Sequence, residues 1–155
     1  MTAISKGRSY EIGILPYNAF KQSESVEVTS MNRAELKRFI LENCNTESDF
    51  PWMKHPNYEV FRHSNNQKWF ALIMDIPKNK LGLQGSDLLD VVNLKCDTLL
   101  IGSLRCEPGF FPAYHMNKDS WITIALDGSV SDDKIKMLLD ASYDATAPKA
   151  RSKKH

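Results

Sequence analysis

The run of residues from Trp69 to Met74 constrains the fold more than any other feature of this sequence. Every position in it is apolar, and an unbroken apolar run of this length is typical of a strand covered on both faces. The run is far too short to cross a bilayer. Tyr58–His63 also resembles a strand, and the turn-forming Ser64–Gln67 separates the two. The pattern therefore predicts a β-hairpin whose second strand, Lys68–Ile76, is central in a sheet.

Composition indicates one globular domain. The chain has 155 residues, of which 42% are hydrophobic and 25% charged, so it can bury a core without disulfides or metal. Its three cysteines, Cys44, Cys96 and Cys106, form an odd and sparse set without a CxxC pair. We expect three free thiols, no bound zinc and a cytoplasmic location.

Two helices are predicted from their N-caps. Asn32 with Glu35 three residues later gives a capping-box-like start for a helix that ends near Asn43–Asn45. Asp97 is predicted to cap a second helix, and Pro108-Gly109 is predicted to end it.

A third helix is predicted to begin after Ser131. Asp132 and Asp133 suit its positive N-terminus, and its inner stripe consists of Ile135, Leu138, Leu139 and Ser142. We expect Trp69 or Phe70 to pack against this stripe.

The remaining strands follow from alternation. Asp90–Cys96 is predicted to place Val92, Leu94 and Cys96 on one face and Val91, Asn93 and Lys95 on the other. His115–Lys118 and Trp121–Leu126 are predicted as the last two strands. Pro77–Leu89 between the strands is predicted as a long loop.

The order of these elements predicts an α+β fold, αβββαββα. Short turns between neighbouring strands favour a two-layer domain: a mainly antiparallel, five-stranded sheet with helices packed on one face. The domain is expected to span residues 31–147. Residues 1–30 form an extension, interpreted either as a short hairpin or as partly disordered, and residues 148–155 form a basic flexible tail.

The charge is unevenly distributed along the chain. The whole sequence has 20 basic and 19 acidic residues, but four of the basic ones lie in the last nine residues, which contain no acid. The chain without this tail therefore has 16 basic and 19 acidic residues, a net charge of −3. A nucleic-acid-binding domain usually has a basic field. The tail is interpreted either as a solvated chain end or as a weak phosphate-binding arm.

Sequence patterns of known catalytic chemistry are missing from the chain. We find no HExxH, no phosphate-binding glycine loop and no GxSxG motif. No catalytic residue, metal ligand or cofactor is therefore predicted.

One polar segment, Tyr114–Trp121, mixes aromatic rings with an imidazole, an amide and an ammonium group. Such a mixture suits base stacking and phosphate contact, but it also fits a solvated hairpin between two core aromatics. A second basic set lies near the first hairpin and consists of Lys54, His55, Arg62 and Lys68. These residues share a face with Lys95 and Lys118 if the strands are neighbours.

Several strings in the chain resemble the YjbR/MmcQ family over residues 31–146. They are Pro51-Trp52, His55-Pro56-Asn57-Tyr58, Arg62-His63, Lys68–Met74, Val92–Asp97, Pro108-Gly109-Phe110, Pro112–Lys118, Trp121, Leu126–Val130 and Ser142-Tyr143. The resemblance implies the αβββαββα fold and a cytoplasmic bacterial protein. The family is commonly labelled DNA-binding, from a "double wing" arrangement of strands and loops. Lys95, His115, Asn117 and Lys118 match its motifs.

The leading hypothesis is a small, monomeric, non-enzymatic DNA-binding protein. Its contacts would be weak and non-specific, made to phosphates by lysines and to bases by stacking. The candidate residues are Lys54, Arg62, Lys68, Lys95, His115, Asn117, Lys118 and Trp121. The alternative is a protein-interaction module that uses the open sheet face or an edge. A third hypothesis is an enzyme acting on a small anion around His115 and Lys118. No membrane partner is predicted, and no specific small-molecule substrate is identified.

Overall fold

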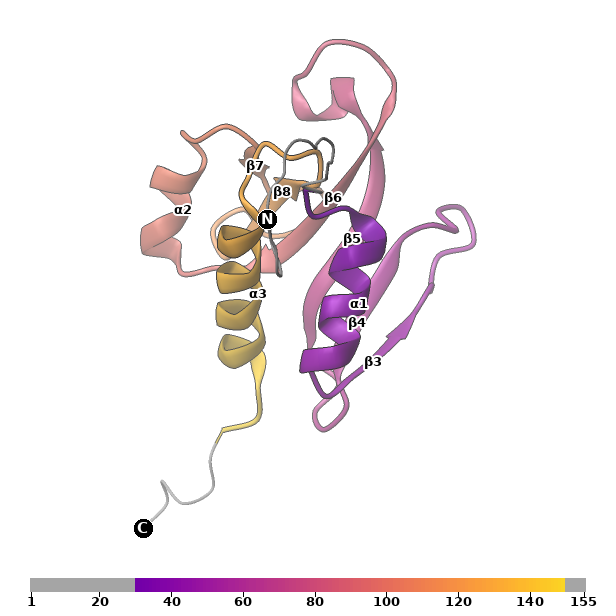
Figure 1. Ribbon diagram of the computed structural model, residues 1–155, viewed down its shortest axis with the longest axis vertical. Coiled ribbons are helices and arrows are strands. Elements are labelled where there is room, and N and C mark those ends of the chain that lie inside the picture. Colours follow the sequence, from indigo (N-terminus) through magenta and orange to yellow (C-terminus); the bar gives the residue numbers. More distant parts are fainter. Residues whose placement is uncertain (1–29, 150–155) are drawn as a thin grey trace, which may run out of the picture.

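The computed structural model describes residues 30–149. The predicted hairpin in residues 1–30 and most of the basic tail lie outside this range. The described chain forms three α-helices and one sheet in an α+β arrangement (Figure 1). In chain order they are α1 (Arg33–Asn43), β3 (Thr46–Asp49), β4 (Glu59–His63), β5 (Trp69–Pro77), the 3-10 turn η1 (Lys78–Leu81), β6 (Leu88–Lys95), α2 (Thr98–Leu104), β7 (Phe110–Pro112), β8 (Trp121–Ala125) and α3 (Asp132–Thr146).

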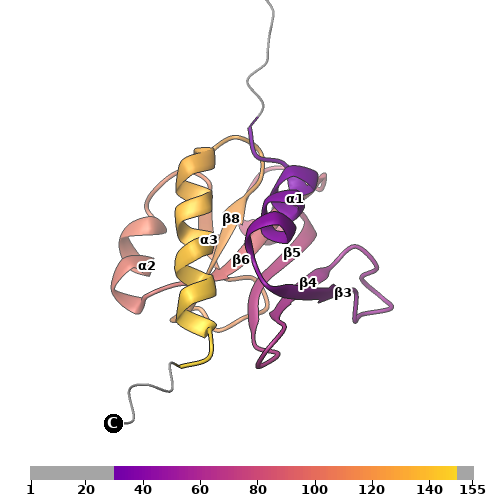
Figure 2. The ribbon, with the colours of Figure 1, turned by 60° about the horizontal axis from the view of Figure 1, so that its bottom comes forward.

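The strands form one antiparallel sheet in the order β3-β4-β5-β6-β8-β7. Strand β5 pairs with β4 on one side and β6 on the other, and Phe70 to Met74 are all buried. The prediction of a central, doubly covered strand is confirmed. The three helices lie side by side over one face of the sheet (Figure 2), as predicted.

All three predicted N-caps are present. The side chains of Asn32, Asp97 and Ser131 accept hydrogen bonds from the backbone amides of Glu35, Leu99 and Lys134. Each bond satisfies an amide that the helix itself leaves without a partner. The helix starts were therefore readable from local chemistry, whereas α2 ends at Leu104, earlier than the predicted end at Pro108-Gly109.

The prediction of five strands was wrong, because β3 at Thr46–Asp49 makes a sixth. Thr-Glu-Ser-Asp contains no apolar residue, so it lacks the alternation by which strands are recognised. It is an edge strand that pairs only with β4. The order along the chain is therefore αββββαββα.

The predicted strand at His115–Lys118 was also wrong, since the strand lies earlier, at Phe110–Pro112. Pro112 has no amide hydrogen to continue the ladder. His115 has a φ of +64°, a left-handed conformation that no strand contains. The segment 113–120 consequently leaves the sheet and turns above it.

The helix-covered face contains the larger core. Phe70 is completely buried there, with its ring edge-on to that of Tyr143 in α3 at 4.9 Å between centroids. The predicted stripe of Ile135, Leu138 and Leu139 belongs to the same cluster. Val92, Leu94 and Cys96 also face the helices, as the alternation of β6 predicted.

Candidate functional site

The second face of the sheet is apolar but carries none of the three α-helices. Its buried residues form a separate cluster of Tyr58, Val60, Leu72, Met74, Ile76, Leu89, Val91 and Ala125. Loops and the turn η1 cover it partly, through Trp52, Leu81, Tyr114 and Met116. We call this surface the open face.

A β-bulge places Trp69 on the open face. Phe61 pairs with Ala71 but its neighbour Arg62 pairs with Trp69, so Phe70 is an extra residue without a cross-strand partner. Phe70 and Ala71 both belong to the helix-side core, whereas Trp69 packs with the open-face cluster. Without the bulge, strict alternation would put Trp69 on the same face as Ala71.

Ser142 of α3 stabilises this bulge. Its buried hydroxyl donates to the Phe70 carbonyl at 2.6 Å and accepts from the Lys95 amide at 2.9 Å. These two backbone groups lie on β5 and β6, just past the last paired residues, Ala71 and Leu94. One side chain therefore bridges β5 and β6 beside the bulge, where the pairing of these two strands ends.

A pocket of about 490 Å³ is hollowed into the open face. Three aromatic rings line it, with Trp52 edge-on to both Trp69 and Tyr58 at 5.8 and 6.0 Å between centroids. We call it the aromatic pocket. Its other lining residues are Leu72 and Met74 from the sheet and His55, His115, Met116 and Asn117 from the loops. The size and apolar lining are typical of a site for a small organic group.

A buried polar ring holds the loop 113–118 over the sheet. Thr123 accepts from the Tyr114 amide at 2.9 Å and donates to the Asn93 side chain at 2.5 Å, and Asn93 donates to the Tyr114 carbonyl at 2.9 Å. Asn93 and Thr123 are both fully buried. Because each polar group has a partner, this ring fixes the loop rigidly.

His115 extends from this anchored loop with an exposed side chain. Its ring lies 4.0 Å from that of Tyr114, centroid to centroid. A left-handed backbone at a residue with a side chain is unfavourable by roughly 1–2 kcal/mol. Such conformations gather at functional sites, which marks His115 as a candidate.

Two further hollows carry lysines and adjoin the aromatic pocket. The Lys95 hollow, of about 370 Å³, contains Lys68, Lys95 and Trp121 and shares Trp69 and Met116 with the pocket. The Lys118 hollow, of about 620 Å³, contains Lys80 and Lys118 and shares His115, Met116 and Asn117 with it. No carboxylate lines any of the three.

Most of the residues singled out in the sequence therefore meet on one face. Lys68, Lys95 and Trp121 lie in one hollow, with the Lys95 ammonium 5.7 Å from the Trp121 ring centroid. His115, Asn117 and Lys118 line the Lys118 hollow. Lys54 is exposed on the loop that carries Trp52.

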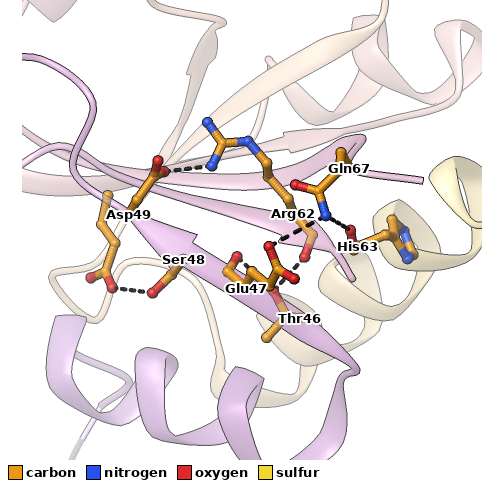
Figure 3. A network of polar contacts seen from close by, with 8 residues as sticks. Thr46, Glu47, Ser48, Asp49, Arg62, His63 and Gln67 are labelled. Atoms are coloured by element: carbon orange, nitrogen blue, oxygen red, sulfur yellow. Dashed lines mark hydrogen bonds and ion pairs between the residues drawn. The ribbon is translucent and has the colours of Figure 1, made fainter. Parts of the chain in front are cut away.

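Arg62 differs from these residues because its charge is already paired. Its guanidinium is 2.6 Å from the Asp49 carboxylate of β3 and lies over the Trp69 ring at 5.8 Å from the centroid. Figure 3 shows this pair within the network between β3 and β4, in which Thr46 also donates to the Arg62 carbonyl. A paired guanidinium attracts phosphate less than a free one. Arg62 is therefore better suited to hold Trp69 and β3 in place.

Sequence reasoning missed several residues of the site. Trp52, Tyr58 and Trp69 were assigned to a loop or to strands, without a role in binding, and Met116, which lines all three hollows, had no assigned role beyond its place in the polar segment. The available signal was the density of aromatic residues around the first hairpin. That signal does not say which face the rings share.

The buried titratable groups beside the site serve structure. Burial, with Tyr114 and Asp75 nearby, raises the pKa of Tyr58, whose ring stacks on His55 at 4.4 Å between centroids. On the helix side, burial lowers the pKa of His63, whose Nε2 lies 2.8 Å from the Thr146 hydroxyl.

Comparison with known proteins identifies the family. The YjbR family model matches residues 41–145. The chain belongs to the YjbR family. A relative in Bacillus subtilis, "Uncharacterized protein YyaQ", is 37% identical over 116 residues, covering 75% of this chain and 98% of that protein. Escherichia coli YjbR is 53% identical over a shorter stretch of 32 residues, or 21% of this chain and 27% of that one.

Solved structures have the same YjbR fold. A Pseudomonas syringae crystal structure superposes with a TM-score of 0.73 at 46% identity, covering 76% of this chain and all of that one. The Deinococcus radiodurans protein DR2400 has a TM-score of 0.61 at 23% identity, covering 79% and 85%, and shows the fold alone. The predicted family resemblance is confirmed.

Two kinds of feature are absent from residues 30–149, the part of the chain that the structure describes. Within that range, no three His, Cys, Asp or Glu side chains gather as metal ligands would. No helix there combines the length and apolarity that a bilayer crossing demands.

The thiols are expected to differ in reactivity. Cys106 is exposed and Cys96 buried; burial raises the pKa of Cys96, while burial with Asp140 and Asp144 raises that of Cys44 to about 11. Because the thiolate is the reactive form, a disulfide-exchange reagent at pH 8 should titrate one thiol fast and all three after denaturation. Cys106→Ser should abolish the fast phase. Two fast thiols, or an intact mass short by two protons, would contradict this expectation.

Proposed function

We propose that this YjbR-family protein binds DNA with its open face, non-enzymatically and through weak, non-specific contacts. The observation that carries the proposal is the set of lysines around the aromatic pocket. Lys68, Lys95 and Lys118 form no ion pair with a carboxylate of the described chain. Unpaired ammonium groups beside exposed rings are the usual combination for phosphate contact and base stacking.

The distribution of acids supports this proposal despite the net charge of −3 that the chain has without its tail. The helix α3 holds four aspartates against two lysines. It packs on the other face of the sheet, and only its last residues, Ala145 and Thr146, line a hollow. The three hollows of the open face are lined by lysines and histidines without carboxylates. A domain whose net charge is negative can therefore present a local positive field to DNA. In this proposal, the loops 50–58 and 113–120 are the two wings of the double-wing arrangement.

The same lining argues for binding rather than catalysis. General acid–base chemistry needs a proton donor and acceptor placed on the same substrate, and carboxylates are absent from the walls of all three hollows. The histidines His55 and His115 are exposed. Hydrogen bonding and stacking by these rings are sufficient for a binding role.

The test separates the fold from the basic tail. A chain truncated after Ala147 should keep most of its affinity for an oligonucleotide, with a dissociation constant of about 10 micromolar or weaker at physiological salt. Lys95→Ala and Lys118→Ala should each weaken binding and lower the salt slope by about one unit. Lys136→Ala on α3 is the matched control and should bind normally. Fluorescence anisotropy against salt concentration measures all four.

Two outcomes would overturn the proposal. No binding by the full chain at low salt removes the DNA function. Binding that truncation abolishes, while Lys95→Ala and Lys118→Ala remain normal, assigns the affinity to the tail alone.

The second candidate function is a protein-interaction module. The observation that favours it is the edge strand β3, whose outer side has no strand partner within the described chain. An added peptide strand would pair there. Capture of a protein from lysate that survives nuclease, and that depends on β3 rather than on Lys95, would favour this function.

A further inference from the structure

The aromatic pocket adjoins both lysine hollows. It shares Trp69 and Met116 with the Lys95 hollow, and His115, Met116 and Asn117 with the Lys118 hollow. The aromatic pocket therefore has two cationic neighbours, and Met116 lines all three hollows. A ligand that matches them has a flat apolar group joined to two anions, one for each lysine hollow.

A single nucleic-acid strand has this alternation. Each unpaired base is a flat ring that stacks on aromatic side chains, and each has a phosphate before and after it. In a duplex the bases are stacked on their neighbours and paired, so no ring is free to enter a pocket. The apolar lining of the pocket would then contact no base.

The rim of the pocket matches the polar edge of a base. The Asn117 amide offers two donors, since its oxygen already accepts from the Asp119 amide at 2.8 Å. The His115 imidazole offers one donor and one acceptor when neutral. Both residues line the pocket and are exposed. The base ring would lie against Trp52, Trp69 and Leu72, where the lining is apolar.

The pocket is preorganised for an unpaired base. The edge-on contacts of Trp52 with Trp69 and Tyr58 hold the rings apart, and the bonds from Asn93 and Thr123 fix the loop that carries His115. A rigid site loses little conformational entropy on binding.

We propose that the aromatic pocket receives one unpaired base, so that the protein binds single-stranded DNA in preference to duplex. This inference rests on the proposed function and specifies its ligand. The lysine hollows contact the phosphates on either side of that base.

The experiment compares three probes of equal length: a thymidine oligonucleotide, its duplex with adenosine, and a strand of abasic sites. All three tryptophans of the chain lie on the open face, in the pocket or the Lys95 hollow. Base stacking should therefore quench the intrinsic fluorescence. We expect the thymidine strand to bind about 5- to 150-fold more tightly than the abasic strand, the factor that one base stack supplies, and to bind more tightly than the duplex.

Matched variants assign the effect to the pocket. Trp52→Ala should lose the preference for the thymidine strand, whereas Trp52→Phe keeps a ring and should retain most of it. Phe50→Ala is the control, because Phe50 lies in the same loop but contacts Lys37 of α1 instead. Circular dichroism confirms that each variant is folded, and the Trp52→Phe comparison remains decisive if Trp52→Ala unfolds.

The possible failures are distinguishable. If none of the probes binds, the proposed function falls and this inference with it. If the abasic strand or the duplex binds as tightly as the thymidine strand, DNA binding stands and the base pocket is overturned. An unchanged preference in folded Trp52→Ala would also overturn it.

Discussion

Replacing Phe70 by alanine should lower the free energy of unfolding by about 3–5 kcal/mol. The Phe70 ring is completely buried between the sheet and α3, in edge-on contact with Tyr143, so its removal leaves a cavity that the helix cannot easily fill. The extra residue of the bulge would also lose the side chain that holds it on the helix side. Urea denaturation followed by circular dichroism measures the change.

Leu72→Ala is the matched comparison on the opposite face. Leu72 is only 3% exposed, but it lines the aromatic pocket, where water or neighbouring side chains can occupy the vacated space. We expect a loss near the lower end of the roughly 2–5 kcal/mol range for such substitutions. A loss below about 1 kcal/mol for Phe70→Ala would refute the assignment of Phe70 to the main core.

Replacing Asn93 by alanine should affect both stability and binding. The substitution leaves the Tyr114 carbonyl and the Thr123 hydroxyl without their buried partner, which should cost about 1–3 kcal/mol. The loop 113–118 would lose its anchor, so the affinity for DNA should fall even where the protein stays folded. Thermal unfolding and the oligonucleotide titration measure the two effects separately.

Asn79→Ala provides the control for this experiment. Asn79 is an exposed residue of η1, so its replacement should change neither stability nor affinity appreciably. Normal binding by folded Asn93→Ala would show that the anchored loop is unnecessary for DNA recognition.

Local patterns in the sequence were sufficient to predict most of the architecture. The caps at Asn32, Asp97 and Ser131 depend on side chains within three residues of the amides they accept from. The face of each residue on β6 follows from alternation alone. The apolar run that contains Leu72 marked the central strand correctly, because a doubly buried strand needs no other signal.

The candidate site was predicted only as a set of residues. Lys68, Lys95 and Lys118 come from separate segments of the chain. Their meeting on one face was stated as a condition that depended on which strands are neighbours. The pairing of β5 with β6, and of β6 with β8, supplied that condition.

Strand β3 and the position of Trp69 show where local patterns are insufficient. Thr46–Asp49 becomes a strand because β4 offers it hydrogen bonds and Arg62 pairs with Asp49. Trp69 faces the pocket because the bulge at Phe70 reverses the alternation. The hydroxyl that stabilises this bulge comes from Ser142, 72 residues further along the chain.

The starts of the helices, their caps, the central strand and the faces of β6 follow from local sequence, since each depends on neighbours a few residues away. The aromatic pocket and the lysine hollows beside it exist only because the chain is folded. Trp69 faces the pocket because of a bulge that a hydrogen bond from α3 stabilises. His115 lies at the pocket because the buried side chains of Asn93 and Thr123 anchor its loop. Such contacts join residues that are distant in sequence, and they form only when the packed layers have brought their partners together.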